Sequence, residues 1–150
     1  MNRARGMSLL ELMIVVALIA TLAGIGAMVI GRSLPGRELH DAARTVAGEL
    51  RFARARAIAT GRPQVFVIDV NSREWRGADE RQGRLPEGLD VVATTALEER
   101  PARDQAAVRF FPEGASTGGR IVIKRSEAAW RVDVAWLTGE VTLGRGEGEP

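Results

Sequence analysis

The first pattern along the chain is a long apolar segment. Residues 12–30 contain a single polar side chain, Thr21. As a helix rising 1.5 Å per residue, these nineteen residues span about 28 Å, close to the hydrocarbon thickness of a bilayer. The main alternative is a cleaved secretory signal, but its apolar part usually has about 7 to 15 residues and ends at a small-residue cleavage site. We therefore predict a retained membrane-spanning helix.

A second helical pattern follows Pro35 and Gly36, where we expect a kink or a break. Apolar residues then recur at intervals of four and three, at Leu39, Ala43, Val46, Leu50, Ala53 and Ala57. This spacing predicts an amphipathic helix that ends near Thr60 and buries this stripe, together with Ile58. The opposite face carries Arg44, Arg51, Arg54 and Arg56. We interpret these arginines as a solvated surface rather than a phosphate-binding ridge.

From Gln64 onward the apolar period changes to two, which predicts strands. The predicted strands are residues 65–70, 74–76, 90–94, 108–111, 121–124, 131–136 and 141–143. In the sixth, Val132, Val134 and Trp136 alternate with more polar positions, as in an antiparallel sheet with one buried face. We expect Trp130 or Trp136 to join the core.

Three other segments are predicted to connect or to end these elements. The charged stretch 77–105 is expected to form exposed, mobile loops around one short strand. The glycine-rich sequence "FFPEGASTGGRIVI", residues 110–123, lacks the lysine of a phosphate-binding loop and favours a hairpin connection. The tail, residues 145–150, is predicted to be disordered.

The charge balance and the few residues able to carry chemistry do not favour an enzyme. The chain has 21 basic and 19 acidic residues, and two of the arginines lie in the first six positions, so residues 7–150 balance at zero. It has no cysteine and one histidine, His40, which lacks an evident nucleophile or metal partner. We interpret His40 as a surface or helix-packing residue.

The stretch "RGMSLLELMIVV", residues 5–16, places one carboxylate, Glu11, at the edge of the apolar run. An unpaired charge inside a bilayer costs up to about 3 kcal/mol, so such a residue is a functional candidate. The alternative is that Glu11 extends to the aqueous interface. These residues alone leave both interpretations open.

The same stretch resembles the processing site of type IV pilin-like proteins. A short basic leader ends in Gly6, a hydrophobic residue, Met7, follows, and Glu11 occupies the fifth mature position. Phenylalanine is commoner than methionine at the first mature position of that family. The resemblance implies that a prepilin peptidase cuts after Gly6 and methylates the new amine of Met7. It also implies that Glu11 pairs with a neighbouring subunit's N-terminus, which would set the register between helices.

Residues 39–75, 110–123 and 132–144 are similar to the H-type minor pseudopilin of the type II secretion system and to the related T-type minor pilin of type IV pili. The resemblance implies a non-enzymatic subunit near the tip of a periplasmic pseudopilus. Its partners would be the other minor pseudopilins, the major pseudopilin, the prepilin peptidase and the inner membrane, with no cofactor and no nucleic acid.

The predicted fold is therefore a pilin-like α+β architecture, with a long N-terminal helix packed on antiparallel sheet. We expect a cleaved leader over 1–6, a transmembrane and assembly helix over 7–33, and an amphipathic helix over 34–62. A periplasmic β domain would cover 63–144. The chain would cross the inner membrane once.

Two alternatives from other classes remain open. A DNA-binding minor pilin of a DNA-uptake system would need clustered basic groups on its exposed domain, which the balanced charge does not favour. A membrane-tethered enzyme would need a pocket with convergent polar groups and no processing after Gly6.

Overall fold

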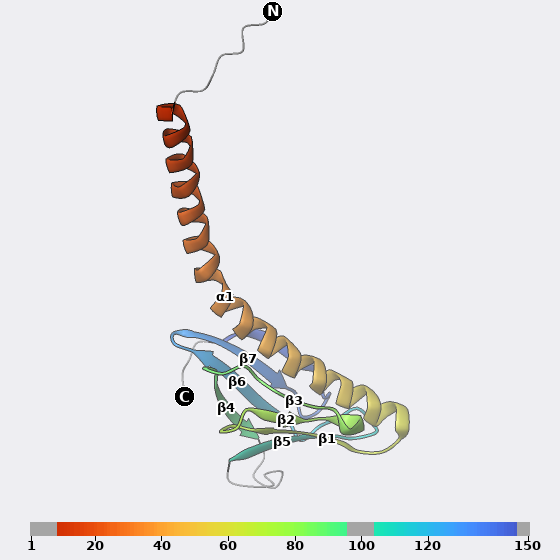
Figure 1. Ribbon diagram of the computed structural model, residues 1–150. Helices are drawn as coiled ribbons and strands as arrows, with labels where there is room; N and C mark the ends of the chain where they lie inside the picture. Colours follow the sequence, from red (N-terminus) through yellow and green to blue (C-terminus); the bar gives the residue numbers. More distant parts are fainter. Residues whose placement is uncertain (1–8, 96–103, 147–150) are drawn as a thin grey trace, which may run out of the picture. The chain divides into compact units, whose positions relative to one another are not determined.

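The computed structural model describes residues 9–95 and 104–146, and it has the predicted α+β composition (Figure 1). One long helix, α1 (Leu9–Thr60), precedes eight strands and a short 3-10 helix, η1 (Ala78–Glu80). The strands are β1 (Gln64–Asp69), β2 (Glu74–Arg76), β3 (Gln82–Arg84), β4 (Asp90–Thr95), β5 (Gln105–Phe110), β6 (Gly119–Arg125), β7 (Ala128–Val134) and β8 (Val141–Gly146).

We expected a kink or a break at Pro35 and Gly36; the helix α1 continues through both residues, so there is no break. Proline removes one backbone hydrogen bond, and the remaining bonds of a long helix can bridge that loss. The chain nevertheless divides here into two compact units, one ending at Pro35 and one beginning at Gly36. We expected the first half of the helix to span a membrane. In the described residues, no helix combines the length and the hydropathy needed to cross one.

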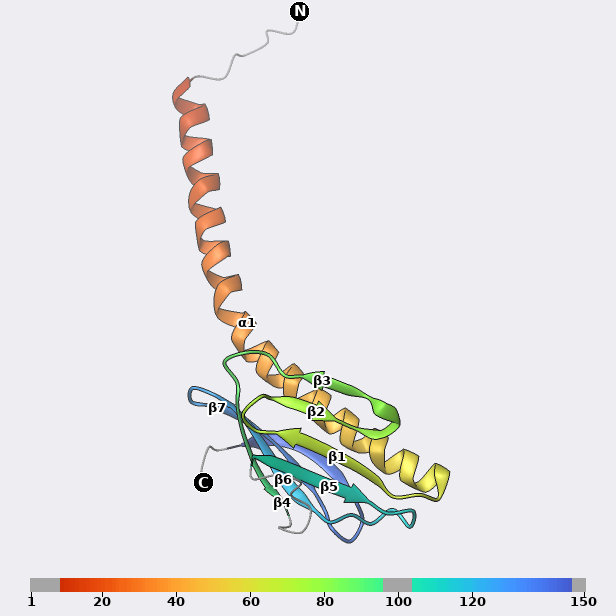
Figure 2. The same ribbon diagram turned by 60° about the horizontal axis from the view of Figure 1, so that its bottom comes forward.

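The strands form two four-stranded sheets, both fully antiparallel. The first sheet has the order β3-β2-β1-β5, and the second has the order β4-β6-β7-β8. Figure 2 shows the first sheet in front, with β3 next to the helix. In its centre Phe66 lies opposite Val108, and in the second sheet Ile123 lies opposite Trp130. The prediction of an antiparallel sheet or pair of sheets is confirmed.

The core lies between the second half of α1 and the inner faces of both sheets. The predicted stripe of six apolar helix residues is confirmed, since each is at most 1% exposed. The largest fully buried side chains from the sheets are Phe66, Ile68, Phe110, Ile121 and Ile123. Burial of each large side chain stabilises the fold by about 1.5 to 3 kcal/mol.

Ile58 was expected in the core and lies outside it. The expectation that Trp130 or Trp136 joins the core is confirmed for Trp130, whereas Trp136 lies outside it. Ile58 is 49% exposed, because it is in the last turn of α1, one residue beyond the end of the stripe. Trp136 is 69% exposed, because β7 ends at Val134 and the chain turns where Gly139 N donates to Ala135 O. Trp130 does pack against the core, in a partly buried position.

The connection over residues 110–123 is a hairpin turn only in its first part, where Phe110 and Ser116 form an antiparallel bridge and Thr117 N donates to Arg109 O at 2.9 Å. The whole connection does not pair β5 with β6. It leaves β5 in the first sheet and enters β6 in the second, so it joins the two sheets rather than two neighbouring strands. The bend at Pro112 and Gly114 is present, with Gly114 N donating to Phe111 O at 2.9 Å. Local turn residues signal a change of direction, but they carry no information about which strand becomes the partner.

The stretch 77–105 is more structured than we expected. It contains η1, β3 and β4, and it buries Ala78, Leu85 and Leu89 in the core. Charged neighbours obscured these apolar residues, because each is isolated in the sequence. The expectation for 96–103 lies outside the described residues. The predicted disordered tail begins too early, since Arg145 and Gly146 belong to β8, and 147–150 also lie outside the described residues.

Candidate functional site

The first candidate surface is the start of α1, where large apolar side chains are exposed. Leu9 is 80% exposed, and the remaining large apolar side chains from Leu10 to Leu22 are all more than 40% exposed. Successive residues of a helix point about 100° apart, so this run covers every side of it. A helix that is apolar all round is normally enclosed by protein or lipid. We call Leu9–Leu22 the apolar helix surface.

Two polar residues of the apolar helix surface have different positions. Thr21 lies within it, and its hydroxyl donates to the carbonyl of Leu18 at 2.8 Å, which satisfies the donor locally. Glu11 is exposed in the first turn of α1, where the positive end of the helix dipole favours a carboxylate. Gly6 and Met7, the predicted cleavage and methylation positions, lie outside the described residues.

The polar face of α1 holds the second unit together. We had interpreted four arginines as a solvated surface, and three of them instead make specific contacts. Arg51 Nη2 donates to Val141 O at 3.0 Å, and Arg54 Nε donates to Gly114 O at 3.2 Å. Arg56 forms an ion pair with Asp79 at 2.7 Å. These long side chains attach the helix to β8, to the link between the sheets and to η1, respectively.

An ion pair between a buried carboxylate and a half-exposed arginine, which the sequence analysis missed, fixes the segment after η1. Arg81 Nη2 lies 2.6 Å from Glu49 Oε1, and Arg81 Nε donates to Glu49 Oε2 at 2.9 Å. The Glu49 side chain is only 8% exposed. Its hydrogen bonds and charge raise the pKa of Arg81. The sequence signal was a carboxylate one turn after Val46 and beside Leu50, next to the apolar stripe.

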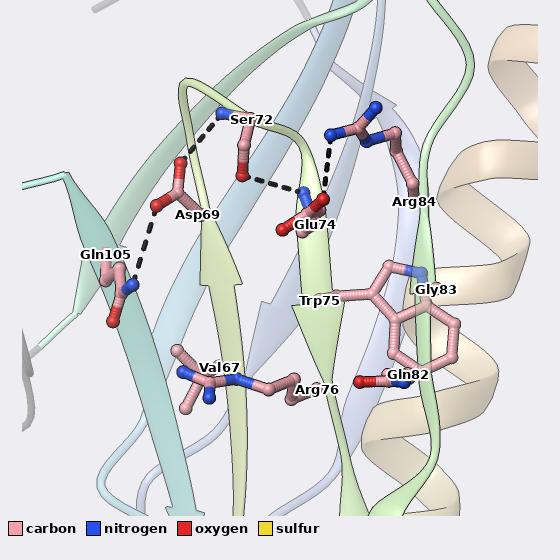
Figure 3. Close-up of a pocket in the computed structure, with 10 residues that line it drawn as sticks. All are labelled: Val67, Asp69, Ser72, Glu74, Trp75, Arg76, Gln82, Gly83, Arg84 and Gln105. Carbon is pink, nitrogen blue, oxygen red and sulfur yellow. Dashed lines mark hydrogen bonds and ion pairs between the residues drawn. The ribbon is translucent and has the colours of Figure 1, made fainter.

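The outer face of the first sheet carries a shallow hollow of about 610 Å³ (Figure 3). Three of its charged groups make hydrogen bonds within the sheet and its turn. Asp69 accepts hydrogen bonds from the backbone of Ser72 at 2.8 Å and of Asn71 at 3.0 Å, and Arg84 pairs with Glu74 at 2.7 Å. The Ser72 hydrogen bond is the main cause of a lowered pKa of Asp69. These contacts stabilise the β1–β2 turn and the β2–β3 pair.

The residues that could carry other chemistry do not converge. Within residues 9–95 and 104–146, no group of three histidine, aspartate or glutamate side chains could hold a metal ion. The His40 ring packs 4.5 Å from the ring of Trp130, and its Nδ1 lies 3.9 Å from Asp41. This position agrees with a helix-packing histidine.

Comparison with solved structures identifies the fold as pilin-like. The minor pseudopilin EpsH from the type 2 secretion system of Vibrio cholerae matches with a TM-score of 0.59 at 22% identity, over 75% of this chain and 99% of that one. The type IV minor pilin FimU of Pseudomonas aeruginosa matches with a TM-score of 0.56 at 14% identity, over 73% and 90% of the two chains. Both matches show the fold.

Sequence comparison then places the chain in one family. Residues 42–139 match the family model described as Type II transport protein GspH, and residues 1–30 match the prokaryotic N-terminal methylation motif. The type II secretion system protein H of Xanthomonas campestris is 45% identical over 95% of this chain and 85% of that protein. The Klebsiella pneumoniae protein H is 28% identical over 92% and 72%. The chain belongs to the GspH family.

Proposed function

We propose that the chain is a minor pseudopilin, a structural and non-enzymatic subunit of the type II secretion pseudopilus near its tip. In this role it supports the export of folded proteins across the outer membrane. The observation that carries the proposal is the 45% identity to a type II secretion system protein H along nearly the whole chain. The apolar helix surface also supports the proposal, because a helix that exposes apolar side chains on every side is normally enclosed by lipid or protein.

The proposed mechanism is assembly through the N-terminal helix. The prepilin peptidase cuts between Gly6 and Met7 and methylates the amine of Met7, in agreement with the methylation-motif match over residues 1–30. Before assembly the apolar helix surface anchors the subunit in the inner membrane, with the second unit in the periplasm. In the filament the same surface packs against the helices of the major and other minor pseudopilins. No cofactor takes part.

Glu11 has the role of an assembly residue in this proposal. Its carboxylate is exposed next to apolar side chains, so enclosing it in the filament without a counter-charge is unfavourable. A positively charged N-terminus on the adjacent subunit supplies that charge. Only the helix register that brings the two groups together is then favourable, and Glu11 selects it.

The type IV pilus is the alternative system for this fold. The match to FimU shows the shared architecture but has only 14% identity. A DNA-binding pilin would also need a cluster of basic groups, whereas Arg56, Arg84 and Arg120 are paired with carboxylates. Salt-sensitive binding of DNA by the purified protein would favour this alternative.

The first test is the intact mass of the membrane-extracted protein, with and without a co-expressed prepilin peptidase. We expect loss of residues 1–6 and gain of one methyl group, both abolished in Gly6→Ala. A full-length, unmodified chain in the presence of active peptidase would contradict the proposed processing.

The second test separates assembly from processing. In a type II secretion host that lacks its own protein H, Glu11→Gln should be cleaved normally but should fail to restore secretion. Asp41→Asn is the matched control, because Asp41 is also an exposed carboxylate of α1 but lies outside the apolar helix surface. Secretion restored equally by both variants would refute the role of Glu11.

A further inference from the structure

A second hollow, of about 640 Å³, lies where α1 meets the second sheet near the start of the second unit. Arg37 and His40 line it from the helix, and Trp130 and Arg145 line it from β7 and β8. We call it the Trp130 hollow. The two helix residues are about 90 or more positions away in sequence from the two strand residues. The site therefore exists only in the folded chain.

The Trp130 hollow combines an indole ring with cations that have no carboxylate partner. Arg145 lies over the Trp130 ring, with its guanidinium carbon 5.9 Å from the ring centre. In the described part of the chain no ion pair involves Arg37 or Arg145, whereas nearby Arg125 pairs with Glu38 at 2.8 Å. One carboxylate, Glu127, lines the hollow. The balance is therefore positive, and guanidinium groups bind phosphate oxygens through paired hydrogen bonds.

The sequence places the Trp130 hollow close to the apolar segment. The last residue of the apolar run, Ile30, precedes Gly36, at the rim of the hollow, by six positions of the continuous helix α1. At 1.5 Å per residue this separation along the helix is about 9 Å. Because the proposed anchoring holds residues 12–30 in the bilayer, this short connection keeps the second unit within reach of the lipid headgroups. Tryptophan favours the membrane–water interface, because its ring is apolar and its N–H is polar.

We propose that the Trp130 hollow binds the phosphate group of an anionic phospholipid, with Arg37 and Arg145 as its ligands and the Trp130 ring against the glycerol region. This inference rests on the proposed membrane anchoring. Binding there orients the second unit at the membrane surface before assembly. Extraction of the subunit into the filament then has to break these contacts.

The experiment uses the full chain in nanodiscs of phosphatidylcholine with a minority of phosphatidylglycerol. The chain has no cysteine, so a single Ala128→Cys substitution at the rim of the hollow accepts one nitroxide label. The readout is broadening of the two lipid phosphorus resonances by the label. A label at Thr138→Cys is the control, because β7 separates positions 128 and 138 by about 20 Å.

We expect the Ala128 label to broaden the phosphatidylglycerol signal more than the phosphatidylcholine signal. The double variant Arg37→Gln/Arg145→Gln should abolish this preference, because each basic side chain at an anionic surface contributes about fivefold. The variant Arg37→Lys/Arg145→Lys should keep part of it. A charge-matched control, Arg62→Gln/Arg76→Gln, should retain it fully, since both arginines are exposed and neither lines the hollow.

The outcomes separate this proposal from the anchoring on which it rests. A chain that does not insert into the nanodisc refutes the anchoring. A chain that inserts but broadens both lipid signals equally refutes the lipid site. Added inorganic phosphate should leave the preference for phosphatidylglycerol unchanged. If the label instead broadened the inorganic phosphate resonance and the preference was lost, the hollow would be a site for free phosphate. An unchanged thermal transition in each variant ensures that loss of the preference reports binding rather than unfolding.

Discussion

Replacement of Gly139 by alanine tests the junction at which α1, the link between the sheets and the β7–β8 turn meet. Gly139 has a φ of 62°, and a Cβ built on it overlaps the carbonyl oxygen of Gly114 and lies 3.0 Å from Arg54 Nε. That carbonyl is the acceptor of the Arg54 hydrogen bond. Because backbone atoms cannot give way as a flexible side chain can, Gly139→Ala must displace one of these three segments.

The magnitude follows from a matched pair of glycines. Gly61 has a φ of 64°, but nothing lies within 4 Å of a Cβ there. Gly61→Ala therefore reports only the left-handed backbone, about 1 kcal/mol. Gly139→Ala adds the steric overlap, typically 1 to 3 kcal/mol more, so we expect a total of about 2 to 4 kcal/mol.

The assay is denaturant unfolding of the full chain in detergent, followed by tryptophan fluorescence, with both variants measured against the parent. The difference between the two variants isolates the overlap from the backbone strain. Equal losses of stability in Gly61→Ala and Gly139→Ala would refute the packing of the turn against Gly114.

Three further predictions concern the core, the first sheet and its turn. Leu50→Ala should lower the free energy of unfolding by about 2 to 5 kcal/mol, and Ile58→Ala by less than about 1 kcal/mol, because only Leu50 is fully buried. Equal effects in thermal unfolding would contradict the assigned helix face. Gly83→Ala should destabilise by about 1 to 3 kcal/mol and shift the Trp75 fluorescence, because the added Cβ would lie 2.6 Å from the indole; an unchanged spectrum would disprove this contact. The pKa of Asp69 is lowered from 3.8, so its stabilisation is complete above that value and is lost as the pH falls below it. As the pH falls, the free energy of unfolding should therefore drop more for the parent than for Asp69→Asn. Parallel dependence of the two free energies on pH would contradict this role of Asp69.

Regular periodicity made the helical part of the fold predictable. The stripe from Leu39 to Ala57 repeats over five turns, and each of its residues is buried as the spacing requires. The alternation at Val132 and Val134 was equally informative, because a strand with one buried face has a strict period of two. Strand pairing was not predictable. The turn residues of 110–123 predicted the local hairpin turn, but nothing in them shows that the chain then passes to the second sheet.

The candidate sites also differed in whether the sequence alone could reveal them. Glu11 could be proposed as a site residue because a short, contiguous motif surrounds it, and residues 1–30 match the N-terminal methylation motif. The Glu49–Arg81 pair and the Trp130 hollow were not found, since their members are separated by 32 residues in the first case and by about 90 in the second. Only the folded chain brings these side chains together, and single charges in the sequence do not reveal their partners.

The contact of Arg51 with Val141 joins residues 90 positions apart, so it can form only long after α1 has been translated. The helix α1 is synthesised first, but the strand that completes its surroundings, β8, is the last element of the chain. At about 5 to 20 residues per second, roughly 4 to 16 s pass between translation of Thr60 and of Val141. During that interval the second sheet is incomplete, so part of the apolar stripe of α1 stays uncovered until β8 has been made.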